Sequence, residues 1–165
     1  MERICRLSDW INRVAQYVGF VQLSLMTFVI ILQVFYRYVL GSSLSWSEES
    51  ARFLFIWVVM LGASMGVKEG FHVAVTLFKD WLPPRLKTGV DILFTLLTGV
   101  MAAAMVVFGS SIADTVAIQQ SPAIRISMFW VYLAIPVSGA LMLVHLAARL
   151  AELAQGWNAA GKGDC

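Results

Sequence analysis

Two glutamates and an arginine stand together at the start of the second long apolar stretch of this 165-residue chain. Glu48 and Arg52 are four positions apart with the acid first, which is the favourable order for an ion pair on one helix face. Glu49 is three positions from the same arginine, and acidic residues in a first helical turn also suit the helix dipole. An exposed pair of this kind is worth under about 1 kcal/mol. The cluster therefore either secures a helix start or offers a charged contact to a partner, and both interpretations stay open.

The two histidines are the other side chains whose type suggests chemistry. Imidazoles on two helices can ligate a haem iron, as in the membrane anchors of respiratory enzymes. His72 and His145 both lie where an apolar stretch meets charged residues, so we expect them at a membrane surface, hydrogen-bonding rather than binding a cofactor. A haem- or quinone-binding anchor subunit of an oxidoreductase is kept as the alternative function. Cys5 and Cys165 have no metal-ligand spacing, and we expect both to be free thiols.

The composition places the chain among integral membrane proteins. It is 59% hydrophobic and 13% charged, against about 45–50% and about 25% in soluble domains. The length fits a single membrane domain over residues 1–165. A net charge of +2 is too small to indicate nucleic acid as a partner.

Four long uncharged runs predict an all-α fold with four transmembrane helices. A spanning helix needs about 20 apolar residues. With the flanking residues that continue each helix, the predicted spans are 14–37, 46–67, 90–114 and 126–148. The first run is too long for a cleavable signal peptide, so we expect it to stay as a span.

Capping and proline residues set the ends of these helices. Ser45 and Glu48 fit a capping box, with the serine as N-cap, and this extends the short second run to full length. The pair at 121–122, serine and proline, breaks the chain between the third and fourth spans, and Pro136 is expected to kink the fourth.

The connection between the second and third spans predicts a short amphipathic helix over residues 71–82. Its apolar side chains recur at helical spacing, at Phe71, Val75, Phe78 and Leu82. Such a stripe favours a helix that lies on the membrane surface. The proline pair at 83–84 ends it.

The basic residues predict the orientation. Lys and Arg are enriched in cytoplasmic connections. Nine fall on one side: Arg3, Arg6, Arg13, Lys68, Lys79, Arg85, Lys87, Arg149 and Lys162. Three fall on the other: Arg37, Arg52 and Arg125. We therefore predict that both termini are cytoplasmic and that the connection from Arg37 to Arg52 faces outward.

The predicted spans carry no ionisable side chain near their centres. Proton and ion pathways need such groups, so we expect no catalytic, substrate-binding or metal-binding residue and no enzymatic activity. Gly62 and Gly66 form a small-xxx-small face on the second span, which permits close approach of another helix. That helix could belong to this chain or to a partner, and we favour internal packing.

The stretch from residue 33 to 72 resembles a known family. Its segments read Arg37-Tyr38-Val39-Leu40, Leu44-Ser45-Trp46-Ser47-Glu48-Glu49, Ala51-Arg52-Phe53-Leu54-Phe55-Ile56-Trp57 and Leu61-Gly62-Ala63, followed by Lys68 and His72. This order is similar to that of the small, Q-type membrane subunit of tripartite ATP-independent periplasmic (TRAP) transporters. The later spans resemble the family only in their pattern.

The resemblance implies a role in secondary transport across the bacterial inner membrane. Such transporters import organic acids with sodium. A periplasmic binding protein captures the substrate, and a large multi-span permease subunit carries the substrate and sodium sites. The small subunit packs on the large one as a scaffold, can offer a docking surface to the binding protein, and needs no cofactor of its own.

For individual residues the resemblance implies structural roles. Glu48, Glu49 and Arg52 would secure the outward start of the second span, and Arg37 is a candidate partner for one of the glutamates. Lys68 and His72 would mark the cytoplasmic edge. The predicted structural or partner-interface residues are thus Arg37, Trp46, Glu48, Glu49, Arg52, Gly62, Gly66, Lys68 and His72.

Overall fold

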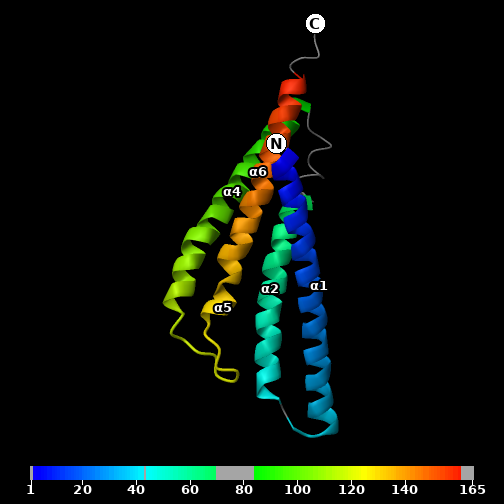
Figure 1. Cartoon of the computed structure of the whole chain (residues 1–165), viewed down its shortest axis with the longest axis vertical. Coiled ribbons are helices and arrows are strands. Elements are labelled where there is room, and N and C mark those ends of the chain that lie inside the picture. Colours follow the sequence, from blue (N-terminus) through cyan, green and yellow to red (C-terminus); the bar gives the residue numbers. More distant parts are fainter. Residues whose placement is uncertain (1, 43, 70–83, 161–165) are drawn as a thin grey trace.

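The computed structural model describes residues 2–42, 44–69 and 84–160. These residues form four long helices and a short one: α1 (Glu2–Val39), α2 (Ser45–Glu69), α4 (Pro84–Thr115), α5 (Phe129–Tyr132) and α6 (Ala134–Ala160) (Figure 1). The predicted interfacial helix over residues 71–82, and with it His72, lies outside the described residues.

The prediction of an all-α protein with four long apolar helices is confirmed. Segments long and apolar enough to cross a membrane run over Ser8–Val39, Ser45–Glu69, Ile92–Thr115 and Phe129–Leu150. At 1.5 Å per residue, the 25 residues of α2 measure about 37 Å, which exceeds a hydrocarbon core of about 30 Å.

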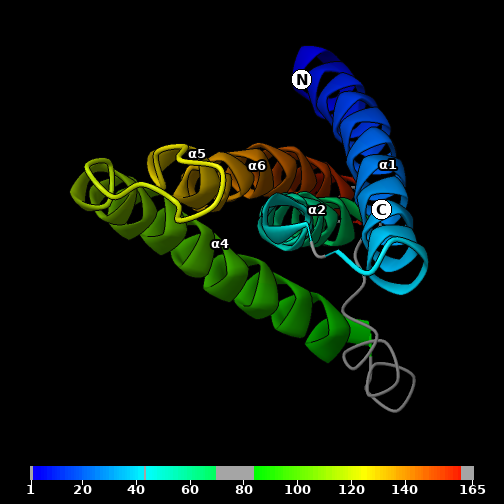
Figure 2. The same ribbon diagram turned by 90° about the horizontal axis from the view of Figure 1, so that it is seen from below.

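The helices pack in the order α1, α2, α6, α4, each against the next (Figures 1 and 2). Four spans return the chain to its starting side, so the start of α1 and the end of α6 lie at one end of the bundle. We call this the terminal end. The opposite loop end holds the α1–α2 connection and the loop of residues 116–128 that joins α4 to α5.

The closest helix contact joins α4 and α6, and glycine permits it. A Cβ added to Gly139 would lie 2.9 Å from the carbonyl oxygen of Ala102, and one added to Gly109 would lie 2.8 Å from Ile135 Cγ2. Ala102, Met142 and Leu146 form a buried cluster at the same interface. Small residues bring membrane helices together in this way because close approach increases van der Waals contact.

The last span is interrupted near Pro136, where a kink was predicted. Residues 126–128 belong to the loop, since the amide of Ser121 donates to the carbonyl oxygen of Ile126. Leu133 then separates α5 from α6. Pro136 lacks the amide hydrogen that would bond to the carbonyl oxygen of Tyr132 in a continuous helix, and its ring crowds that turn. The fourth span is therefore two helices in series.

Candidate functional site

A buried serine holds the start of α2. The Ser47 hydroxyl donates to the carbonyl oxygen of Leu44 at 2.7 Å, and the Ser47 side chain is fully buried. Trp46 beside it is 44% exposed, which leaves its ring available to lipid. The helix already includes Ser45, which was predicted as its N-cap, and the side-chain bond at this end is made by Ser47 instead.

The ion pair expected from helical spacing is formed. Arg52 Nη2 lies 3.2 Å from Glu48 Oε1, and the two side chains are 65% and 70% exposed. Screening by solvent limits such a pair to under about 1 kcal/mol. Arg37 lies in the last turn of α1 and, within the described residues, makes no ion pair with Glu48 or Glu49.

Glu49 performs a different task from its neighbour. Its Oε2 atom accepts hydrogen bonds from the backbone amides of Ala123, at 2.9 Å, and Ile124, at 3.0 Å. These amides belong to the loop of residues 116–128, which lies 74 and 75 positions further along the chain. A carboxylate that accepts from two adjacent amides makes charge-assisted bonds of the stronger kind. Glu49 thereby ties α2 to the connection between the third and fourth spans.

The loop that Glu49 holds has an ordered backbone. Gln120 and Ser127 form an isolated antiparallel bridge, and the Ser127 hydroxyl donates to the carbonyl oxygen of Ala117 at 2.7 Å. Arg125 adopts a left-handed conformation with φ of 59°, which is uncommon for a residue with a side chain. The loop end is thus a folded surface.

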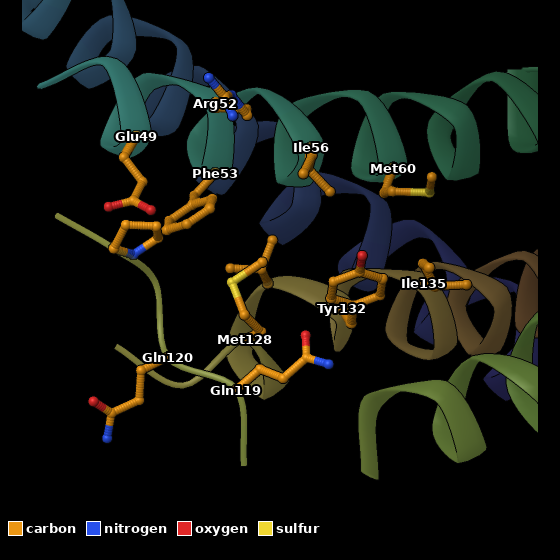
Figure 3. Close-up of a pocket in the computed structure, with 12 residues that line it drawn as sticks. Glu49, Arg52, Phe53, Ile56, Met60, Gln119, Gln120, Met128, Tyr132 and Ile135 are labelled. Carbon is orange, nitrogen blue, oxygen red and sulfur yellow. The ribbon is translucent and has the colours of Figure 1, made fainter. Parts of the chain in front are cut away.

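A pocket of about 540 Å³ opens between α2 and this loop (Figure 3). Its α2 wall contains Glu49, Phe53, Ile56 and Met60, which recur at helical spacing. The opposite wall comes from the loop and from α5 and α6: Gln119, Gln120, Pro122, Met128, Val131, Tyr132 and Ile135. Arg52 completes the lining.

The terminal end is joined by two polar contacts from consecutive residues of α1. Lys68 Nζ lies 2.6 Å from Asp9 Oδ1, which links α2 to α1. The Ser8 hydroxyl and His145 Nδ1 lie 2.8 Å apart, which links α1 to α6. His145 Nε2 is buried and has no hydrogen-bond partner among the described residues.

The predicted Gly62–Gly66 face makes no close helix contact within the part of the chain that the structure describes. A Cβ added to either glycine meets no atom of the described residues within 4 Å. The close contact between α4 and α6 is made at Gly109 and Gly139, and the preference for internal packing at Gly62 and Gly66 stays a prediction.

Comparison with known proteins decides the family. A family model described as "Tripartite ATP-independent periplasmic transporters, DctQ component" matches residues 26–156. The chain belongs to this DctQ family. It is therefore a small permease subunit of a TRAP transporter, not an enzyme, and the predicted resemblance is confirmed.

Separate small subunits are among its relatives. The chain is 26% identical over 143 residues to the sialic acid TRAP transporter small permease protein SiaQ of Vibrio cholerae, covering 87% of this chain and 83% of the relative. It is 32% identical over 137 residues to the C4-dicarboxylate TRAP transporter small permease protein DctQ of Rhodobacter capsulatus, covering 78% and 58%.

A longer relative contains the DctQ-like region as one part. The isethionate TRAP transporter permease protein DctMQ of Oleidesulfovibrio alaskensis is 33% identical over 139 residues, covering 75% of this chain but 21% of the relative. The chain thus spans about a fifth of that protein's length.

The sequence did not predict most of the hydrogen-bond and ion-pair partners of the site residues in this DctQ protein. Glu49 was chosen, but the loop amides that it binds were not, because a backbone amide has no signature in the sequence. Asp9 and Ser8 were passed over, although an acid at the border of the first apolar run, on the same predicted side as Lys68, was a usable signal.

Proposed function

We propose that this DctQ subunit packs against a large permease subunit in the bacterial inner membrane and scaffolds it for sodium-coupled uptake of an organic acid. A periplasmic binding protein would deliver the acid. The observation that carries the proposal is the match to about a fifth of a single-chain permease, because a region fused to the rest of a permease must work beside it. Relatives named for sialic acid and C4-dicarboxylates support an organic acid as substrate.

The proposed orientation rests on charge. The nine basic residues on the side of the termini favour a cytoplasmic terminal end, and the loop end then faces the periplasm. Two side chains of the loop suit a docking surface for the binding protein. Ile118 is 92% exposed, and Arg125 is exposed on its left-handed backbone.

The Gly62–Gly66 face is the proposed contact for the large subunit. The described residues leave it open, and small residues let a partner helix approach closely. Arg37, Trp46, Glu48, Glu49 and Arg52 are proposed to set the outer border of this interface, and Lys68 and His72 the inner border.

Reconstitution tests the function directly. Proteoliposomes with the subunit alone should show no sodium-driven uptake of an organic acid, whereas adding the large subunit and the binding protein should give uptake. The described parts of the four spans contain no ionisable residue near their centres that could carry coupling in this chain. Sodium-driven uptake by the subunit alone would contradict the proposal.

A further inference from the structure

The polar contacts at the terminal end include a buried histidine. Ser8 and His145 are each only 3% exposed, and the Ser8 hydroxyl lies 2.8 Å from His145 Nδ1. Ser8 begins the first apolar segment, and His145 lies in the last two turns of the fourth. Both side chains therefore lie close to one membrane surface, where a local opening exposes them to water.

The histidine ring is held with one nitrogen unsatisfied. His145 Nε2 has no hydrogen-bond partner among the described residues. A neutral imidazole has one N–H group and one lone pair, whereas a protonated imidazole has two N–H groups and a positive charge. In the protonated ring Nδ1 would donate to Ser8, and Nε2 would be a charged donor buried without an acceptor. Because burial of a charged donor is far more costly than burial of a neutral nitrogen, the closed contact requires the neutral ring.

The charges around His145 do not offset a further positive charge. Lys68 of α2 and Asp9 of α1 both influence the ring electrostatically, and they act in opposite directions. They are bound to each other at 2.6 Å, so the pair presents little net charge. The other charged side chains described within four positions of these contacts are Arg6, Arg13, Glu69 and Arg149. From α4, the described side chains of residues 92–113 include no titratable group.

The seam between α1 and α6 is short and loosely packed. α1 packs mainly against α2 and approaches α6 at the terminal end (Figure 1). Further from that end, a groove of about 330 Å³ lies between α1, α2 and α6, with Ile11 and Leu141 in its walls. Asn12, one turn from Ser8, has a buried Oδ1 atom with no hydrogen-bond partner among the described residues. Opening of the seam would give water to this oxygen and to His145 Nε2, which lowers the cost of opening.

We propose that the Ser8–His145 contact is a proton-sensitive latch between α1 and α6. With a neutral ring, the latch holds the terminal end of α1 against α6. When the imidazole takes up one proton from water, a charged donor lies buried near the Lys68 ammonium, and the end of α1 moves off α6 until water solvates the ring. The Asp9–Lys68 pair keeps α1 on α2, so only the seam opens. The latch belongs to the subunit itself and does not depend on the proposed scaffold function.

Distances between spin labels test the latch in the full-length chain in nanodiscs. With both native cysteines replaced by serine, Trp10→Cys and Ala147→Cys place labels at exposed positions of α1 and α6. Between about pH 7.5 and about pH 5.5, imidazoles titrate and ordinary carboxylates do not. Over this range the ratio of open to closed molecules should rise by up to about tenfold per pH unit, and the label distance should lengthen.

A control pair distinguishes the opening of one seam from general unfolding. Tyr38→Cys and Phe55→Cys place labels at exposed positions of α1 and α2, away from the terminal end. Their separation should stay constant over the same pH range. Equal lengthening of both pairs would overturn the proposal, because the whole bundle would then be loosening.

Two matched substitutions assign the response to one histidine. His145→Asn keeps a polar atom near the position of Nδ1 but does not titrate, so the label distance should no longer depend on pH. His72→Asn removes the other histidine of the chain and should retain the response. If His145→Asn does not fold, imidazole NMR signals of the His72→Asn protein give the midpoint of His145 protonation, which should coincide with the midpoint of opening.

Three further results would overturn the latch. The first is a distance between the α1 and α6 labels that does not change with pH. The second is a pH response that persists in folded His145→Asn protein. The third is a midpoint of opening that differs from the midpoint of His145 protonation.

Discussion

Glu48 and Glu49 are adjacent carboxylates at the start of α2, but their contacts differ in kind and in expected contribution to stability. Glu48 pairs with Arg52 on the exposed side of α2, where water screens the interaction. Glu49 accepts two backbone hydrogen bonds from a loop that belongs to another helix pair. The removal of one side chain loosens a surface pair, whereas the removal of the other releases a connection between two halves of the bundle.

Alanine substitutions at the two positions should therefore differ. Glu49→Ala is expected to lower the free energy of unfolding by about 1–2 kcal/mol, because two amides lose a charged acceptor. Glu48→Ala should cost under about 1 kcal/mol. Reversible denaturation in detergent, followed by tryptophan fluorescence, measures both. Equal losses of unfolding free energy would show that the Glu49 contact to the loop contributes no more to stability than the exposed Glu48 pair.

The same two carboxylates are expected to contribute to assembly with the large permease subunit. The double substitution of Glu48 and Glu49 by alanine should reduce co-purification of the large subunit or uptake by the complex, and should leave substrate preference unchanged. The substrate would be handled elsewhere, since this subunit is proposed only to scaffold the large one. A changed preference with normal assembly would contradict this expectation.

At the terminal end, Asp9 and Lys68 should stabilise each other. Lys68 is 22% exposed and Asp9 66% exposed, so solvent reduces the interaction, and we expect a small favourable coupling. A double-mutant cycle with Asp9→Asn and Lys68→Met measures it. A matched cycle with Arg37→Met in place of Lys68→Met serves as the control, because Arg37 lies in the last turn of α1, far from Asp9. Coupling that is absent from the first cycle, or equal in both, would count against the ion pair.

At the scale of helices, two helical glycines differ in how closely a neighbouring helix approaches them. Gly139 of α6 lies against the backbone of α4, where the carbonyl oxygen of Ala102 cannot move aside easily. Gly62 of α2 meets no described atom within 4 Å of its Cβ position. The first glycine permits the close contact between α4 and α6, and the second lies on a helix surface that no described atom approaches closely.

Alanine at each glycine separates these roles. Gly139→Ala should destabilise the subunit by about 1–3 kcal/mol through overpacking. Gly62→Ala should be neutral or stabilising by up to about 1 kcal/mol, because alanine is the better helix former. Thermal unfolding of the purified subunit compares them. A larger loss at Gly62 than at Gly139 would mean that the tight contact lies on α2.

A larger side chain then tests the proposed partner face. Gly62→Leu should leave the isolated subunit folded and should reduce its co-purification with the large permease subunit. Ala103→Leu, at an exposed position of α4, is the matched control. Undiminished assembly with Gly62→Leu would move the proposed interface to another face.

At the scale of the whole molecule, the two ends of the bundle should lie on opposite sides of the membrane. In a variant with both native cysteines replaced by serine, Gln120→Cys should react with an impermeant maleimide added from the periplasmic side. Glu69→Cys should react only after the inner membrane is opened. The excess of basic residues at the terminal end is the physical reason. Reversed labelling would overturn the proposed orientation.

The sequence by itself determined the helices and the contacts within them. A run of apolar residues long enough to cross a bilayer has few alternatives to a helix, because lipid leaves no other partner for the backbone. The four long apolar helices followed from this. The Glu48–Arg52 pair followed from helical spacing, and the break near Pro136 from the missing amide hydrogen.

Only the tertiary structure decided which faces meet. In lipid, the inward and outward faces of a helix are both apolar, so the pattern of hydrophobic residues does not reveal the packing face. This is why the Gly62–Gly66 face was assigned to internal packing while Gly109 and Gly139 make the close contacts. Two long-range polar contacts also required the folded chain. Glu49 accepts from a loop amide 74 positions further along the chain, and Lys68 pairs with Asp9, 59 positions before it.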